Sequence, residues 1–157
     1  MNPKLLFALS LFAMAMILGS CGNGYKEVTI AENFVIEPEW KEITPESPLP
    51  VEREYQYVRI SVKEPFDAFA ARGIETPVGE VVNPEIMLIG ENENRTYQLV
   101  WKGADREPLG GEYVNYGVEN SLPKHLKVSK VFIRSDVPIP TKKINWSVFN
   151  WRDVNTK

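Results

Sequence analysis

The sequence predicts an all-β protein: an antiparallel β-sandwich, immunoglobulin-like or jelly-roll, with one short helix. Hydrophobic residues alternate with a period of two along several short segments, as expected for strands that bury one face. The chain also contains 12 Pro and 10 Gly, which separate these segments and disfavour long helices. Many short strands with turn-rich connections are typical of sandwiches and barrels.

The clearest strand pattern lies in residues 55–63. Val58, Ile60 and Val62 share one face, which we expect to be buried, and Arg59 lies on the opposite face. Further strands are expected at 27–30, 85–89, 95–101, 112–118, 128–134 and 143–149. The second and third of these flank a polar turn and predict a hairpin. Trp101 and Trp146 alternate with apolar neighbours and are expected in the core.

The expected helix covers residues 64–73. Pro65 near its start, Asp67 in its first turn and Gly73 after its end are typical helix boundary signals. Phe66 and Phe69 are spaced to pack the helix against the sheet. At about two turns, this helix would connect strands and would not form a layer.

The amino-acid composition argues against several classes of function. The chain has 157 residues, room for one domain at most, and 18 Lys and Arg against 21 Asp and Glu give a net charge of −3. This balance argues against a broadly basic nucleic-acid binder. One Cys and one His permit neither an internal disulfide nor a Cys/His zinc cage.

No chemical motif points to an enzyme. His125 lies between two lysines in 122–127 and is interpreted as an exposed loop residue. No phosphate-binding loop or EF-hand pattern is present, so no catalytic residue, cofactor or metal ligand is predicted. A calcium site assembled from distant carboxylates and carbonyls stays open, because such sites leave little local signature.

The first twenty residues are interpreted as a targeting segment. Lys4 precedes the apolar run Leu5–Leu18, whose 14 residues would span about 21 Å as a helix. That length falls short of the ~30 Å hydrocarbon core of a bilayer and is typical of a secretory signal peptide.

The sequence Leu18-Gly19-Ser20-Cys21 resembles the lipobox of bacterial lipoproteins. The resemblance implies a diacylglycerol on the Cys21 thiol, cleavage before Cys21 and acylation of the new amino terminus. Several acyl chains would anchor the protein stably in a membrane of the cell envelope. Gly22, where many lipoproteins retained at the inner membrane have Asp, favours the outer membrane.

The predicted organisation has three parts: a signal peptide at 1–20, a lipidated and Pro-rich segment at 21–50, and a β-sandwich domain at 51–157. Residues 37–50 hold four prolines, which favour an extended chain. This segment is either a spacer that holds the domain off the membrane or an ordered arm fixed to the domain by Trp40 and Ile43.

Three aromatic residues are the candidate ligand-binding positions. Trp151 follows the last expected strand beside Asn150 and Arg152. Tyr55 and Tyr57 form a stripe with Arg59 on the first strong strand. Rings at such positions stack on sugars or contact partner proteins. The alternative is that they are structural: Trp151 would close one end of the domain, and the tyrosines would form a second covered face.

The function expected from these observations is a lipid-anchored, non-catalytic envelope protein that binds another envelope protein or supports a surface assembly. One alternative is a carbohydrate-binding module that uses the aromatic positions. A second is an envelope hydrolase that depends on two carboxylates, for which glutamates are plentiful.

Overall fold

A computed structural model describes residues 25–51, 55–70, 72–93, 95–106 and 111–149. The predicted all-β, antiparallel class is confirmed. The strands are β1 (Tyr25–Glu32), β2 (Val35–Ile36), β3 (Lys41–Ile43), β4 (Leu49–Pro50), β5 (Tyr55–Val62), β6 (Asp67–Ala70), β7 (Gly73–Glu75), β8 (Val81–Val82), β9 (Glu85–Gly90), β10 (Thr96–Arg106), β11 (Glu112–Val118), β12 (Lys127–Arg134) and β13 (Ile139–Phe149).

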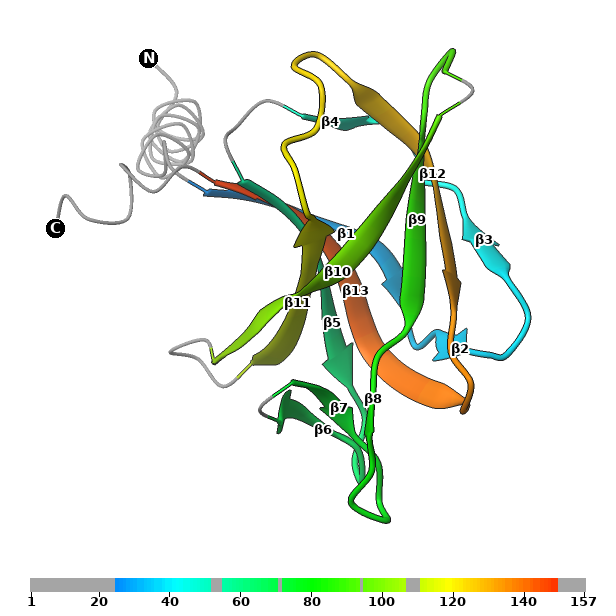
Figure 1. Cartoon of the computed structure of the whole chain (residues 1–157), viewed down its shortest axis with the longest axis vertical. Coiled ribbons are helices and arrows are strands. Elements are labelled where there is room, and N and C mark those ends of the chain that lie inside the picture. The colour runs from blue at the N-terminus through cyan, green and yellow to red at the C-terminus, as the bar shows by residue number, and fades with distance from the viewer. Residues whose placement is uncertain (1–24, 52–54, 71, 94, 107–110, 150–157) are drawn as a thin grey trace, which may run out of the picture.

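Ten of these strands form one sheet, which curls until it is nearly a barrel (Figure 1). Its main path is β1-β13-β5-β11-β10-β9-β12-β3, and β2 and β4 pair with β13 and β12 respectively. The expected hairpin is present, since Leu88 pairs with Tyr97 and Ile86 with Leu99. A small second sheet, β6-β7-β8, lies at one end of the molecule (Figure 1).

Residues 25–50 run antiparallel along the whole length of the β12–β13 segment. β1 pairs with the end of β13 and β2 with its beginning, and then β3 and β4 pair with successive parts of β12. Where the chain turns the corner between β12 and β13, the Ser135 N–H donates to the Glu37 carbonyl at 2.9 Å. Residues 25–50, which include the Pro-rich segment, are therefore a paired arm that covers the edges of β12 and β13, a common way to protect strand edges.

The arm is also held by its side chains. The Arg134 guanidinium lies over the Trp40 ring, 4.7 Å from its centroid, and the same guanidinium pairs with Glu85 at 2.7 Å. Ile36 and Ile43, both from the arm, are buried in the common core. The arm thus contributes both hydrogen bonds and core volume to the domain.

The core follows the alternation read from the sequence. Val58, Ile60 and Val62 are all buried, and so is Trp146, whose indole N–H donates to the Pro50 carbonyl at 3.2 Å. The expectation for Trp101 was wrong, because that side chain is exposed. Pairing between β9 and β10 ends at Leu99, so Trp101 on β10 lies beyond the paired part of β9.

The expected helix at 64–73 is absent from the described residues of that segment. Asp67–Ala70 forms β6, which pairs with β7 through Asp67–Glu75 and Ala70–Gly73. A helix of two turns has little stability of its own, so strand pairing prevails over local helix signals. Gly73, read as a helix stop, lies where a Cβ would come 2.7 Å from the Val82 carbonyl oxygen.

The buried Tyr116 on β11 should make the protein less stable at alkaline pH. Its side chain is 1% exposed, and its hydroxyl donates to Asn83 Oδ1 at 3.0 Å. Burial raises the pKa of Tyr116 well above its ordinary value. Because the unfolded chain ionises this phenol first, the free energy of unfolding should fall as pH rises above about 10, by up to ~1.4 kcal/mol per pH unit.

Denaturant unfolding of the wild type and of Tyr116→Phe between pH 9 and pH 11.5 (roughly the interval around an ordinary tyrosine pKa) measures this effect. The variant should show a shallower alkaline loss, since other tyrosines and lysines titrate in both proteins. Identical slopes would show that Tyr116 does not cause it.

Candidate functional site

The most elaborate group of polar side chains lies on the outer face of the large sheet. The alternation of β5 that buries Val58 and Ile60 turns Arg59 to the opposite face. Strand register places Arg59 directly beside Asn115 on β11 and Asn145 on β13. Arg59 therefore lies at the middle of the five-strand section β1-β13-β5-β11-β10.

The Arg59 side chain is buried by neighbouring side chains although it lies on the outer face of the sheet. Its side chain is 5% exposed; Nη1 lies 2.7 Å from Glu27 Oε1, and Nη2 lies 2.6 Å from Asp105 Oδ1. Its Nε donates to Asn115 Oδ1 at 3.2 Å, and the guanidinium lies 4.2 Å from the centroid of the Tyr113 ring. The planar, permanently charged guanidinium suits such a multi-partner position.

A second set of hydrogen bonds orients these partners. Ser147 Oγ donates to Glu27 Oε1 at 2.8 Å, and Asn115 Nδ2 donates to Asp105 Oδ2 at 3.2 Å. We call Glu27, Arg59, Asp105, Tyr113, Asn115 and Ser147 the Arg59 cluster. It joins β1, β5, β10, β11 and β13, which come from the beginning, middle and end of the described chain. The cluster therefore holds the outer face in one arrangement.

The two carboxylates of the cluster bear on the hydrolase alternative. Glu27 and Asp105 come within hydrogen-bonding distance of the same guanidinium, so both are brought close together. They share the single positive charge of Arg59, and neither lines the hollows described next. This arrangement is that of an ion-paired structural network.

A hollow of about 400 Å³ lies on one side of the cluster. We call it the tyrosine hollow; it is lined by Tyr55, Gln56, Tyr57, Lys102 and residues 118–121. Tyr57 is half-buried, and burial raises the pKa of its hydroxyl. Of the predicted ligand-binding residues, Tyr55 and Tyr57 thus lie together at one concave surface.

Gly117 on β11 provides room for the Tyr57 ring. A Cβ at this position would lie 2.7 and 2.8 Å from two ring carbons and 3.2 Å from the Gln56 carbonyl oxygen. We expect Gly117→Ala to displace the ring and to lower the free energy of unfolding by about 1–3 kcal/mol. Chemical denaturation measures the free energy of unfolding that Gly117→Ala removes. This loss should be smaller when Tyr57 has also been replaced by Ala, and an equal loss with and without Tyr57→Ala would refute the contact.

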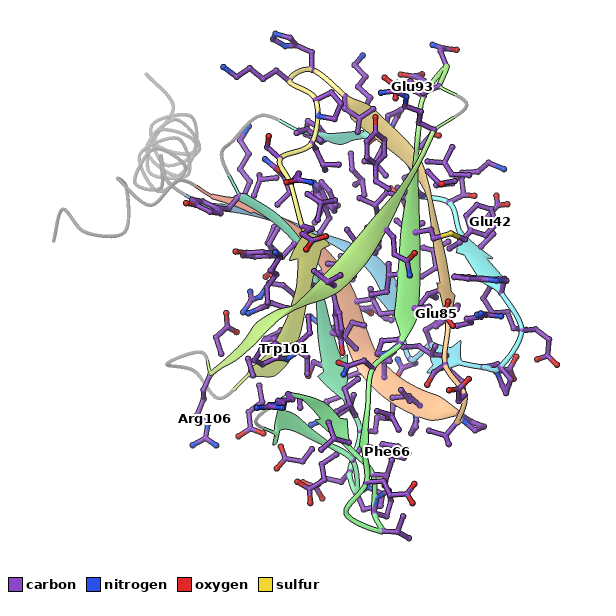
Figure 2. The ribbon with its side chains drawn as sticks, viewed as in Figure 1. Glu42, Phe66, Glu85, Glu93, Trp101 and Arg106 are labelled. Carbon is purple, nitrogen blue, oxygen red and sulfur yellow. The ribbon has the colours of Figure 1, made fainter. Side chains whose placement is uncertain are left out.

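A second hollow, of about 430 Å³, lies on the other side of the cluster. We call it the lysine hollow; its lining includes Ser61, Glu64, Phe66, Tyr113, Lys142 and Lys143. Tyr113 belongs to both the hollow and the Arg59 cluster. Phe66, labelled in Figure 2, lies at the end of the molecule that carries β6–β8.

The remaining sequence-based positions are accounted for as follows. Cys21 and Trp151 lie outside the described residues. His125 is exposed, as expected, and with Glu91 and Glu93 lines a shallow hollow of about 290 Å³. Among the described residues, no group of three His, Cys, Asp or Glu side chains is arranged to hold a metal ion.

Sequence reasoning did not single out Arg59 as the centre of a site. The alternation of β5 placed it in the same candidate stripe as Tyr55 and Tyr57, on the face opposite Val58 and Ile60, and gave it no partners. Its partners come from positions 32 residues earlier and 46 to 56 residues later, so only the strand order could reveal the cluster.

The described part of the chain contains no helix with the length and hydrophobicity needed to cross a bilayer. Comparison with known proteins gave no match to a family model, a curated protein or a solved structure.

Proposed function

We propose that this protein is a lipid-anchored, non-catalytic component of the bacterial cell envelope whose β domain binds another envelope protein. The anchor is the acylated Cys21, and Gly22 favours the outer membrane as its location. The two halves of the curled sheet serve as a sandwich-like scaffold for the binding face. The lipobox supports the anchoring, and the outer face around Arg59 supports the binding.

The observation that carries the binding proposal is the junction of the Arg59 cluster with the lysine hollow. The cluster fixes the backbone of five strands, so the adjoining surface is preorganised and would lose little entropy when a partner binds. Beside it, the partly exposed Phe66 and the edge of the largely buried Tyr113 line a concave region. Aromatic residues in such pockets often dominate the binding energy of protein interfaces.

The charged rim of the hollow would select the partner. Lys143 is half exposed, with its Nζ 3.7 Å from Glu32 Oε1, and Lys142 is exposed beside it. Glu64 and Glu112 also line the hollow, so its rim carries both signs of charge. A partner with an apolar side chain flanked by acidic and basic residues would complement this surface.

Site-specific photo-crosslinking in cells that make the full-length protein tests the proposal. A photoreactive amino acid at Lys142 should give an adduct with one envelope protein, whereas the same group at Lys124, an exposed lysine away from the hollow, should give none. With the purified partner, Lys143→Glu should weaken binding at least tenfold, about 1.4 kcal/mol. Equal adducts at both positions, or an unchanged affinity, would contradict the proposal.

A further inference from the structure

The amino-terminal end of the sheet lies close to the proposed anchor. β1 begins at Tyr25, and Tyr25 pairs with Phe149, which in turn pairs with Tyr55. These three aromatic residues occupy neighbouring positions on three adjacent strands. The tyrosine hollow begins at Tyr55, so it lies at the same end of the sheet.

The length of chain before Tyr25 limits how far this end can move from a membrane. Only Gly22, Asn23 and Gly24 separate Cys21 from Tyr25. Fully extended, the four steps between the two Cα atoms span at most about 14 Å. The headgroup layer on each side of a bilayer is itself ~5–8 Å thick, so an acylated Cys21 would hold the end of β1 at or just above the headgroups.

The residues at this end suit a headgroup environment. Tyrosine is enriched at membrane interfaces because its ring is apolar and its hydroxyl is polar. The lining of the hollow also includes the polar residues Asn120 and Ser121, and its charged residues are Lys102 and Glu119. Lys26, exposed on β1 next to Tyr25, adds a positive charge that anionic lipids attract.

We infer that the protein stands end-on on the bilayer, with the tyrosine hollow against the lipid headgroups. This inference rests on the acylation of Cys21 proposed above. It places the lysine hollow away from the membrane, because the seven steps of β5 from Tyr55 to Val62 rise about 24 Å. The partner-binding surface would then face outward, where another envelope protein can reach it.

Spin labels on the lipidated full-length protein test this orientation. Because the Cys21 sulfur carries the lipid, Asn120→Cys and Val78→Cys each introduce a single free thiol. Asn120 lines the tyrosine hollow, and Val78 is exposed between β7 and β8 at the opposite end. Each protein is reconstituted into vesicles of phosphatidylethanolamine and phosphatidylglycerol that contain a lipid with a nickel-chelating headgroup.

The nickel lipid should shorten the relaxation time of the label at position 120 several-fold more than that of the label at position 78. Equal relaxation at the two positions, or stronger relaxation at 78, would overturn the inference. A soluble glycan that covers the label at position 120, together with no enhanced relaxation of that label in vesicles, would also overturn the inference. That result would assign the hollow to carbohydrate binding.

The intact mass of each preparation separates two kinds of failure. An unacylated Cys21 would contradict the proposed function and the orientation together. An acylated Cys21 with equal relaxation at both labels would contradict the orientation alone. Both labelled positions are exposed, and unchanged thermal unfolding of the two variants shows that the fold is intact.

Discussion

Replacing Arg59 with methionine is expected to lower the free energy of unfolding by about 3 kcal/mol or more. Methionine fills most of the volume but leaves Glu27 and Asp105 close together without their shared cation. Asp105 is 49% exposed and regains some hydration, which keeps the expected cost at the lower end of the range for breaking a buried pair. Urea unfolding of the chain that comprises residues 25–157 measures the change.

Arg106→Met is the matched control. Arg106 also pairs with a carboxylate, Glu112, but its side chain is 60% exposed and points away from the body of the protein (Figure 2). Exposed pairs of this kind contribute about 0–1 kcal/mol. Arg59→Lys should fall between the two variants, because an ammonium cannot span both carboxylates and Asn115 in the same way. Similar costs for Arg59→Met and Arg106→Met would show that the cluster does not stabilise the face.

Removing residues 25–50 is expected to abolish cooperative folding. The truncated chain would lose Ile36, Ile43 and Leu49 from the core and would expose the edges of β12 and β13. At about 1.5–3 kcal/mol for each buried side chain, the core loss alone is about 5–9 kcal/mol. A typical domain has only about 5–15 kcal/mol of net stability.

Thermal unfolding of two truncated chains, residues 25–157 and residues 51–157, measures this effect. The longer one should melt in a single sharp transition, and the shorter one should show no transition or should aggregate through its exposed strand edges. A cooperative transition in the chain 51–157 would mean that the arm is not part of the folding unit.

The class of fold could be predicted because it depends on local alternation. The burial of Val58, Ile60 and Val62 follows from a period of two, and the β9–β10 hairpin follows from two such segments with a polar turn. The helix prediction failed at 64–73 because Gly and Pro signals mark turns between short strands as well as helix ends. Nothing local distinguishes these cases when the partner strand is needed for stability.

The arrangement of the site could not be predicted, because it depends on which strands become neighbours. Tyr55 and Tyr57 were identified from a stripe on one strand, yet the hollow needs residues 118–121, which β11 brings beside them. The four prolines of residues 37–50 favoured an extended segment, and extended chain is equally compatible with the short pairings of β3 and β4. The sequence pattern could therefore not choose between a free spacer and a paired arm.

The most direct test of this account is the intact mass of the mature protein purified from the envelope of cells that make it. We expect a chain that begins at Cys21 and carries a diacylglycerol on the thiol and a fatty acyl group on the new amino terminus. A mass equal to the unmodified chain of 157 residues, with Met1 to Ser20 still attached, would contradict the account.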